Sequence, residues 1–159
     1  MKYGFGVDIG GTTIKIGLFS VEGDLIEKWE IPTNKEDNGK YILTEIADFI
    51  NRTIETKGID KSDVIGVGLG VPGPVNKNGF VSVCVNLGWN SLNVEKEFHE
   101  ISGLPVQVGN DANVAALGEM WQGAGKGYQD VLMVTLGTGV GGGCVLNGKI
   151  VSGIHGAGG

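Results

Sequence analysis

The sequence is poor in several features that mark common classes of protein. No apolar run reaches membrane-spanning length, and the start, MKYGFGVDIGG, has the pattern of a β-strand rather than of a signal peptide. Lysine and arginine number 12 against 18 aspartates and glutamates, so the net charge is −6 and no basic stripe offsets it. We therefore expect a cytoplasmic protein with no membrane partner and no nucleic-acid partner.

Cysteine and histidine are also rare, with two of each in 159 residues. Cys84 and Cys144 lie in separate apolar stretches, which favours buried free thiols in a reducing compartment over a disulfide. His155, in the segment GIHGAGG, has no cluster of cysteine or histidine around it. We therefore expect it to be structural rather than a metal ligand.

The apolar patterns predict a layered α/β domain, because strands are followed by helices. Strands are expected at residues 3–7, 14–20, 24–31, 64–71, 105–108, 131–136, 142–146 and 149–151, with a polar loop at 32–40. Long helices are expected at residues 41–57 and 112–121. A short helix is expected between the cap Asn93 and Gly103, with Val94, Phe98 and Ile101 on one face.

Glycine is abundant, with 30 residues, and two glycine-rich turns stand out. The first is DIGGTT, where Asp8 ends an apolar strand and Gly10 and Gly11 offer free backbone amides. Thr12 adds a hydroxyl, and Lys15 lies close enough along the strand to reach a phosphate. The alternative is a plain tight hairpin, but a carboxylate at a strand end favours a site for phosphate and Mg²⁺.

The second turn, LGTGVGGG, contains a formal match to the dinucleotide fingerprint GxGxxG at residues 137–142. That fingerprint requires a helix after the turn, whereas residues 143–148 predict a strand and an Asn-Gly hairpin turn. A Rossmann site is therefore excluded, and no Walker A motif occurs. Two glycine turns in one chain are suited to hold a polyphosphate from both sides.

Between the two turns lies the motif NDAN at residues 110–113, directly after an apolar strand. Two interpretations of Asp111 stay open, because it is suited both to cap the following helix and to act as a general base. Asn110 and Asn113 are suited to bind sugar hydroxyls. The segments around Gly73, in PGP, and Asn86, in NLGWN, are either a strand end and a loop or parts of a sugar pocket in which Trp89 offers a flat face.

Together and in this order, DIGGTTIKIGL, GVPGPV, NLGWN, NDAN and LGTGVGGG resemble the ROK family of sugar kinases and repressors. Within that family the motifs are most similar to those of bacterial glucokinases of the Gram-positive type. The resemblance implies an actin-like, ribonuclease H-like fold with a mixed sheet flanked by helices. It also implies an N-terminal lobe at residues 1–120 and the beginning of a second lobe at 121–159, with the active site between the lobes.

The resemblance also implies a role for each matching residue. Asp111 would take the proton from the sugar 6-hydroxyl, and Asn110, Asn86 and the turn at Gly73 would border the sugar. Asp8 would hold Mg²⁺, directly or through water. The phosphates of ATP would lie between two groups of residues, Gly10, Gly11, Thr12 and Lys15 on one side and Gly137, Thr138 and Gly139 on the other.

The function that the resemblance implies is ATP-dependent phosphorylation of a hexose, with glucose as the expected acceptor. Kinases for fructose or N-acetylmannosamine, and non-catalytic sugar-binding or regulatory proteins, remain alternatives. ROK kinases continue after GAGG with sugar and zinc ligands, so we expect a fragment with little activity of its own. Structural Zn²⁺ and a homodimer are expected only of the full-length protein.

Overall fold

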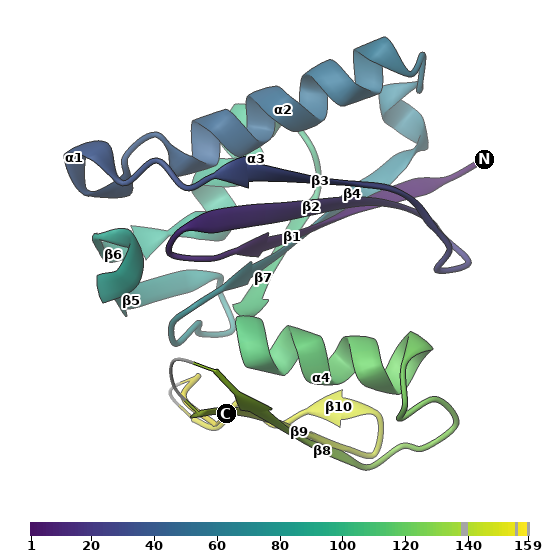
Figure 1. The fold of residues 1–159 in the computed structure, drawn as a ribbon, viewed down its shortest axis with the longest axis vertical. Coiled ribbons are helices and arrows are strands. Elements are labelled where there is room, and N and C mark those ends of the chain that lie inside the picture. Colours follow the sequence, from purple (N-terminus) through teal and green to yellow (C-terminus); the bar gives the residue numbers. More distant parts are fainter. Residues whose placement is uncertain (138–139, 155, 159) are drawn as a thin grey trace.

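A computed structural model describes residues 1–137, 140–154 and 156–158. Its main element is a five-stranded mixed sheet in the order β3-β2-β1-β4-β7 (Figure 1). The strands are β1 (Tyr3–Ile9), β2 (Thr13–Ser20), β3 (Leu25–Pro32), β4 (Val64–Val71) and β7 (Val106–Asn110). The first three are antiparallel neighbours, whereas β1, β4 and β7 run parallel. The expected α/β class and the mixed sheet are confirmed.

The two central strands have one face of large side chains and one face of glycines. Phe5 and Val7 of β1 pair with Val67 and Leu69 of β4, and all four are buried. The residues between them are small, and Gly6 pairs with Gly68 across the same two strands. Because side chains alternate along a strand, the sheet packs a core on one face and leaves room for close approach on the other.

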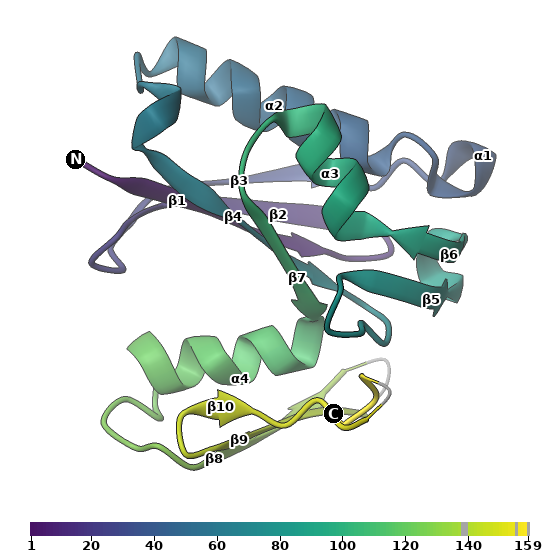
Figure 2. The same cartoon turned by 180° about the vertical axis from the view of Figure 1, so that it is seen from behind.

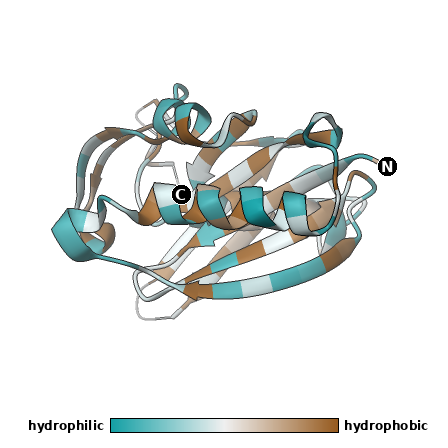
Figure 3. Ribbon diagram, turned by 90° about the horizontal axis from the view of Figure 1, so that it is seen from above, coloured by the Kyte–Doolittle hydropathy of each residue, from teal (hydrophilic) through white to brown (hydrophobic). Residues whose placement is uncertain are grey.

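Helices α2 (Ile42–Thr56) and α3 (Val94–Ser102) cover the apolar face of the sheet (Figure 2). The hydropathy alternates along α2 in Figure 3, and its buried stripe includes Ile42, Ile46 and Ile50. The core contains these and other fully buried side chains, namely Ile9, Ile14, Ile16, Leu18, Leu69, Val71, Leu87, Phe98 and Leu104.

The predicted boundaries of α3 are confirmed, but one predicted core residue is wrong. The Asn93 side chain accepts a hydrogen bond from the backbone N–H of Lys96, and Gly103 ends the helix with a φ of 66°. Phe98 is fully buried, whereas Ile101 is 42% exposed. Ile101 lies three residues beyond Phe98, at the edge of the buried stripe, so helical spacing alone could not decide its burial.

A hairpin that the sequence did not predict projects from the end of β4. Its strands β5 (Phe80–Cys84) and β6 (Trp89–Asn93) are antiparallel, and the 3₁₀ turn Val85–Leu87 connects them. The predicted polar loop contains the single turn α1 (Glu36–Gly39), where Asp37 and Asn38 have positive φ. The Trp89 indole donates a hydrogen bond to the Gly39 carbonyl at 3.1 Å, so the hairpin holds this turn in place.

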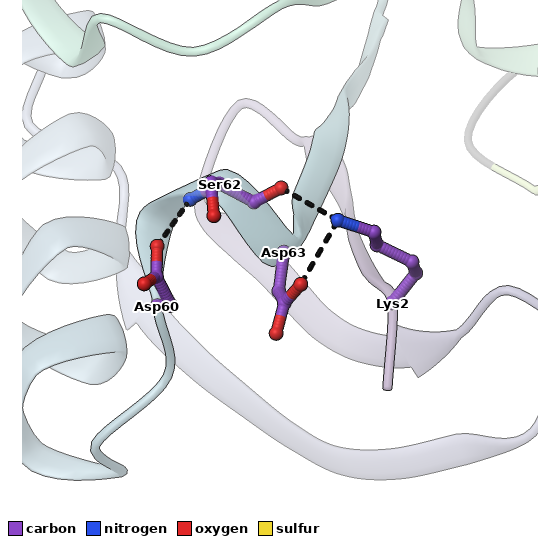
Figure 4. A network of polar contacts seen from close by, with 4 residues as sticks. All are labelled: Lys2, Asp60, Ser62 and Asp63. Atoms are coloured by element: carbon purple, nitrogen blue, oxygen red, sulfur yellow. Dashed lines mark hydrogen bonds and ion pairs between the residues drawn. The ribbon is translucent and has the colours of Figure 1, made fainter.

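The N-terminus is tied to the start of β4 by a polar network (Figure 4). The Lys2 ammonium donates to the Ser62 carbonyl and contacts the Asp63 carboxylate, both at 2.9 Å. Asp60 accepts from the backbone N–H of Ser62 at 2.8 Å and so caps the 3₁₀ turn Lys61–Asp63. Both partners of the ion pair are exposed, so its contribution to stability is small, about 0–1 kcal/mol.

Below the five-stranded sheet, helix α4 (Asp111–Gln122) packs on a second sheet (Figure 1). This sheet has the order β10-β9-β8, with β8 (Val131–Leu136), β9 (Val140–Leu146) and β10 (Lys149–Ile150). A Cβ built on Gly143 would lie 2.6 Å from the Cβ of Ala116, and one on Gly141 would lie 3.5 Å from the Cβ of Ala112. Glycine therefore lets β9 and α4 pack backbone against backbone.

The hairpin predicted after the second glycine turn is confirmed, because a strand and not a helix follows it. Cys84 and Cys144 are both free, as predicted, but only Cys84 is buried, whereas Cys144 is half-buried. None of the helices in the described part of the chain is long and apolar enough to cross a membrane.

Gly143→Ala is expected to lower the free energy of unfolding by about 1–3 kcal/mol, because the added methyl would force β9 away from α4. Gly142→Ala is the control, since its added methyl meets only the Met133 carbonyl at 3.4 Å. Chemical denaturation of both variants measures the difference. Equal decreases in the free energy of unfolding of the two variants would show that the glycine contact between β9 and α4 is not tight.

Candidate active site

Three segments that carry predicted site residues lie at the carboxyl ends of three parallel strands. Strands β1, β4 and β7 end at Ile9, Val71 and Asn110, and their pairing places these ends side by side. Loops that follow parallel strands meet at this edge, where open α/β sheets bind their ligands. The first glycine turn, the PGP segment and the NDAN motif therefore come together although they are far apart in the sequence.

The carboxylates of Asp8 and Asp111 lie near each other because the residue between them, Gly70, has no side chain. Asp8 pairs with Gly70 across β1 and β4, so both lie on the glycine face of the sheet. A Cβ built on Gly70 would lie 3.6 Å from the Cα of Asp111 and 3.0 Å from the side chain of Val114. The first turn of α4 thus packs directly on β4 beside Asp8, with no side chain of residue 70 in between.

The electrostatics of Asp8 reflect this arrangement. Loss of solvent and the nearby charge of Asp111 raise the pKa of Asp8, while Lys15, its cross-strand neighbour in β2, lowers it. Asp8 is still accessible to solvent at its side chain. A cation bound beside Asp8 would relieve the repulsion from Asp111, so the pair fits a divalent metal held together with ligand oxygens.

The first turn of α4 is capped by Asn110 and not by Asp111. The Asn110 side-chain oxygen accepts from the backbone N–H groups of Ala112 and Asn113, at 3.1 and 3.2 Å. The interpretation of Asp111 as the cap is therefore wrong, although its Oδ1 accepts from the N–H of Ala112 at 2.8 Å. Asp111 is half-buried, which leaves its carboxylate available to a ligand.

Asn113 does not fit the role of a sugar ligand that the sequence suggested. It is buried, and its Oδ1 has no hydrogen-bond partner within the described part of the chain. Helical spacing turns Asn113 away from the face that carries Asp111 and Val114. A sugar hydroxyl at Asp111 would therefore not reach it without movement of α4.

The first glycine turn is braced by the loop after β3. The Thr33 hydroxyl donates to the Gly10 carbonyl at 2.6 Å, and the Thr33 N–H donates to the Thr12 carbonyl at 2.9 Å. The N–H of Gly10 donates to the Thr13 carbonyl at 3.1 Å. The prediction of two free glycine amides is therefore wrong for Gly10, and the amides of Gly11 and Thr12 are the candidates for an anion.

The predicted sugar-side residues also lie at this edge. A Cβ built on Gly11 would lie 3.6 Å from the Cβ of Asn86, so the NLGWN segment borders the first glycine turn. The Asn110 amide donates to the Gly73 carbonyl at 3.1 Å, which joins the PGP turn to the start of α4. Trp89 is only 5% exposed and bonds to Gly39, so the idea that it offers a flat face to a sugar is wrong.

The second glycine turn is described only in part. Gly137 follows β8 and a Cβ on it would meet no atom within 4 Å, so the turn is open there. Thr138, Gly139 and His155 lie outside the described residues. Because β9 packs on Ala112 through Gly141, the hairpin that carries this turn is fixed to the same helix as Asp111.

Two further features of the described residues bear on ligands. No group of three or more metal-ligating side chains occurs in ranges 1–137, 140–154 and 156–158. A metal ion at Asp8 would therefore need further oxygens from a molecule bound beside it.

A hollow of about 350 Å³ lies between α1 and β6, lined by residues such as Asp37, Asn38 and Asn90. Of the segments predicted to form the site, only part of NLGWN, at residues 88–90, lines this hollow.

The mixed sheet, the glycine turn between β1 and β2 and the helix after β7 define an actin-like ATPase lobe. The chain belongs to the ROK family, which it matches over residues 4–159. The chain superposes on the ROK family glucokinase from Streptomyces griseus, solved with glucose and AMPPNP, with a TM-score of 0.79 and 37% identity. That match covers 97% of this chain and 47% of the other.

Curated relatives agree with this assignment. The chain is 51% identical to the glucokinase of Halalkalibacterium halodurans over 95% of its own length and 46% of the relative's. It is 37% identical to the glucokinase of Thermotoga maritima over 96% of its own length and 47% of the relative's. The chain thus spans about half the length of the curated relatives that it matches.

Asp111→Asn is expected to lower the pKa of Asp8, because the substitution removes the nearby negative charge without changing the shape of the side chain. Lys15→Gln should act in the opposite direction by removing a positive charge. A carboxyl-detected NMR titration of Asp8 measures both. An unchanged titration midpoint in Asp111→Asn would mean that the two carboxylates are too far apart to interact.

Proposed function

We propose that the chain forms the sugar-binding side and part of the ATP-binding side of a hexose kinase that phosphorylates glucose. The observation that carries the proposal is the approach of Asp8 and Asp111 across Gly70, beside a glycine turn suited to phosphate. The likeness to glucokinases supports this function and favours glucose among the hexoses.

Asp111 is the proposed general base. Its carboxylate is half-buried at the start of helix α4. The side chain of Asn110, rather than that of Asp111, caps this helix. Asp111 is therefore able to accept the proton of a sugar 6-hydroxyl as the oxygen attacks the γ-phosphate of ATP, whose bond to the β–γ bridging oxygen breaks so that ADP leaves. Asn110, Asn86 and the Gly73 turn border the same edge and are proposed to hold the remaining hydroxyls.

Asp8 is proposed to hold Mg²⁺, directly or through water, beside the phosphates of ATP. Its exposed carboxylate and the negative charge of Asp111 suit a cation, and bound Mg²⁺ would supply neutralisation of phosphate charge. The amides of Gly11 and Thr12 and the Lys15 ammonium are proposed to contact the phosphates, with Gly10 shaping the turn. Gly137, Thr138 and Gly139 are proposed to contact the phosphates from the other side.

We further propose that residues 1–120 form one lobe of the kinase and that residues 121–159 begin the second. The five-stranded sheet with α2 and α3, and the three-stranded sheet on α4, support two groups of elements, although the proposed boundary falls within α4. The cleft between lobes would then be bordered by the first glycine turn on one side and by the second on the other. A homodimer remains a proposal for a protein of the relatives' length.

Asp111→Asn is expected to reduce turnover by about 10²–10⁴-fold, because the amide is unable to take the proton from the hydroxyl. The assay couples glucose and MgATP to glucose 6-phosphate formation. It uses a chimera that joins residues 1–159 to the remaining half of the Halalkalibacterium halodurans glucokinase. Asp48→Asn, an exposed carboxylate on α2, is the matched control. Full turnover in Asp111→Asn would refute the assignment of the base.

The 159-residue chain by itself is expected to show little kinase activity, since only part of the proposed cleft is present. A coupled assay that detects ADP, with fructose, N-acetylmannosamine and N-acetylglucosamine beside glucose, measures its turnover and the preference of the chimera. Turnover of the isolated chain equal to that of the chimera would contradict the division into two lobes.

A further inference from the structure

The β5–β6 hairpin carries Asn86, a proposed sugar residue, in the 3₁₀ turn Val85–Leu87 at its tip. The Asn86 side chain is exposed, and its Cβ lies 3.6 Å from a Cβ built on Gly11, so it borders the first glycine turn. Because the turn is only three residues long, the place of Asn86 depends on what fixes the two strands on either side of it.

The residues next to this turn form a buried pair. Cys84 directly precedes the turn at the end of β5, and Trp89 begins β6. The two lie opposite each other across the hairpin, and both are buried. Close-packed interiors leave a side chain few alternative positions, so a contact made by either residue fixes the hairpin at that point.

On one side, Trp89 joins the hairpin to the α1 turn. Its indole donates to the Gly39 carbonyl at 3.1 Å. A Cβ on Gly39 would strike the Leu87 carbonyl, and a Cβ on Gly88 would lie 2.9 Å from the Cα of Asn38. The α1 turn and the tip of the hairpin therefore meet backbone against backbone, with one hydrogen bond beside the contact.

The α1 turn is itself fixed to the beginning of α2. The Asn34 amide, just before the turn, donates to the Glu45 carboxylate at 2.8 Å. A Cβ on Gly39 would lie 2.9 Å from the Cδ1 atom of Ile42, which is fully buried. The bond from Trp89 therefore ties the hairpin to the core of the domain and not to a free loop.

On the other side, Cys84 joins the hairpin to the PGP turn. Its thiol donates to the Pro72 carbonyl at 3.6 Å. A Cβ on Gly73 would lie 3.0 Å from the Val83 carbonyl oxygen and 3.7 Å from the Cys84 sulfur. The hairpin is thus held between the α1 turn and the PGP turn, and Asn86 lies at the end that projects to the sheet edge.

We propose that the buried pair Cys84 and Trp89 positions Asn86 to bind the sugar. This inference rests on the proposed function, which assigns Asn86 and the Gly73 turn to the sugar. Both members of the pair are buried, so they act through these residues and do not contact the sugar. The first glycine turn is braced separately by Thr33, so loss of the pair weakens sugar binding and leaves nucleotide binding unchanged.

The first experiment compares Trp89→Phe with Trp29→Phe in the chimera with the Halalkalibacterium halodurans half. Trp89→Phe removes the indole N–H and keeps an aromatic ring. Trp29 is half-buried on β3 and contacts Phe49 edge to face, so Trp29→Phe is the matched control. Trp89→Phe is expected to raise the KM for glucose about three- to tenfold, the effect of losing one hydrogen bond. The KM for ATP and kcat should equal those of Trp29→Phe.

A double-mutant cycle tests whether Trp89 acts through Asn86. Asn86→Ala alone should raise the KM for glucose, and adding Trp89→Phe should raise it no further, because the residue to be positioned is gone. An equal rise with and without Asn86 would overturn the inference, since a general loss of packing acts in both backgrounds. An equal rise in the KM for ATP and for glucose in Trp89→Phe would overturn it as well.

Cys84→Ala is the second variant, and it keeps the inference testable if Trp89→Phe does not fold. Its control is Cys144→Ala, because Cys144 is the other free cysteine and is half-buried on β9, in the second sheet. Cys84→Ala should raise the KM for glucose and leave the KM for ATP at the value of Cys144→Ala. Equal KM values for glucose in the two variants would refute the role of Cys84.

Amide hydrogen exchange in the 159-residue chain tests the positioning without any ligand. The Gly88 N–H donates to the Val85 carbonyl at 3.2 Å and closes the turn around Asn86. Trp89→Phe should speed the exchange of this amide about three- to tenfold relative to Trp29→Phe. A wild-type chimera that does not phosphorylate glucose would count against the proposed function, and the exchange would then decide. An unchanged rate would show that Trp89 does not fix the turn.

Discussion

The close approach of α4 to the glycine face of the five-stranded sheet determines how the two sheets and the two carboxylates are placed. Gly70 lets the first turn of α4 pack on β4, and that contact brings Asp111 beside Asp8. The same helix accepts the second sheet through Gly141 and Gly143. One helix thus joins the two sheets, and a larger side chain at any of these glycines would push the packed elements apart.

The fold was largely predictable because its strongest signals are local. The alternation of YGFGVDI, with large residues at every second position, predicts a strand with one packed face, and β1 has that face. The spacing of Ile42, Ile46 and Ile50 predicts α2. The cap at Asn93 and the left-handed Gly103 fixed the limits of α3. The resemblance to the ROK family implied a site that contains Asp8, Gly73 and Asp111, and these residues lie near one another because the parallel strands β1, β4 and β7 end at the same edge.

What escaped prediction depends on contacts between distant residues. The hairpin of β5 and β6 has no clear alternation, and its place is fixed by the bond from Trp89 to Gly39, fifty residues away. Whether Asn110 or Asp111 caps α4 depends on the dihedral angles at one strand end, where the Asn110 backbone is extended. The Gly10 amide is not free because it bonds to the Thr13 carbonyl inside the turn, and Asn113 is buried because α4 packs against both sheets. None of these has a signature in the spacing of residue types.

We propose that sugar and nucleotide bind at the carboxyl edge of the sheet and not in the hollow between α1 and β6. Amide chemical shifts of the 159-residue chain, followed during titration with Mg·AMPPNP and then glucose, distinguish these two places. We expect nucleotide-dependent shifts at Gly11, Thr12 and Gly137, and glucose-dependent shifts at Asn86 and Asn110. Shifts confined to the lining of the hollow, around Asn38 and Asn90, would refute binding at the edge of the sheet.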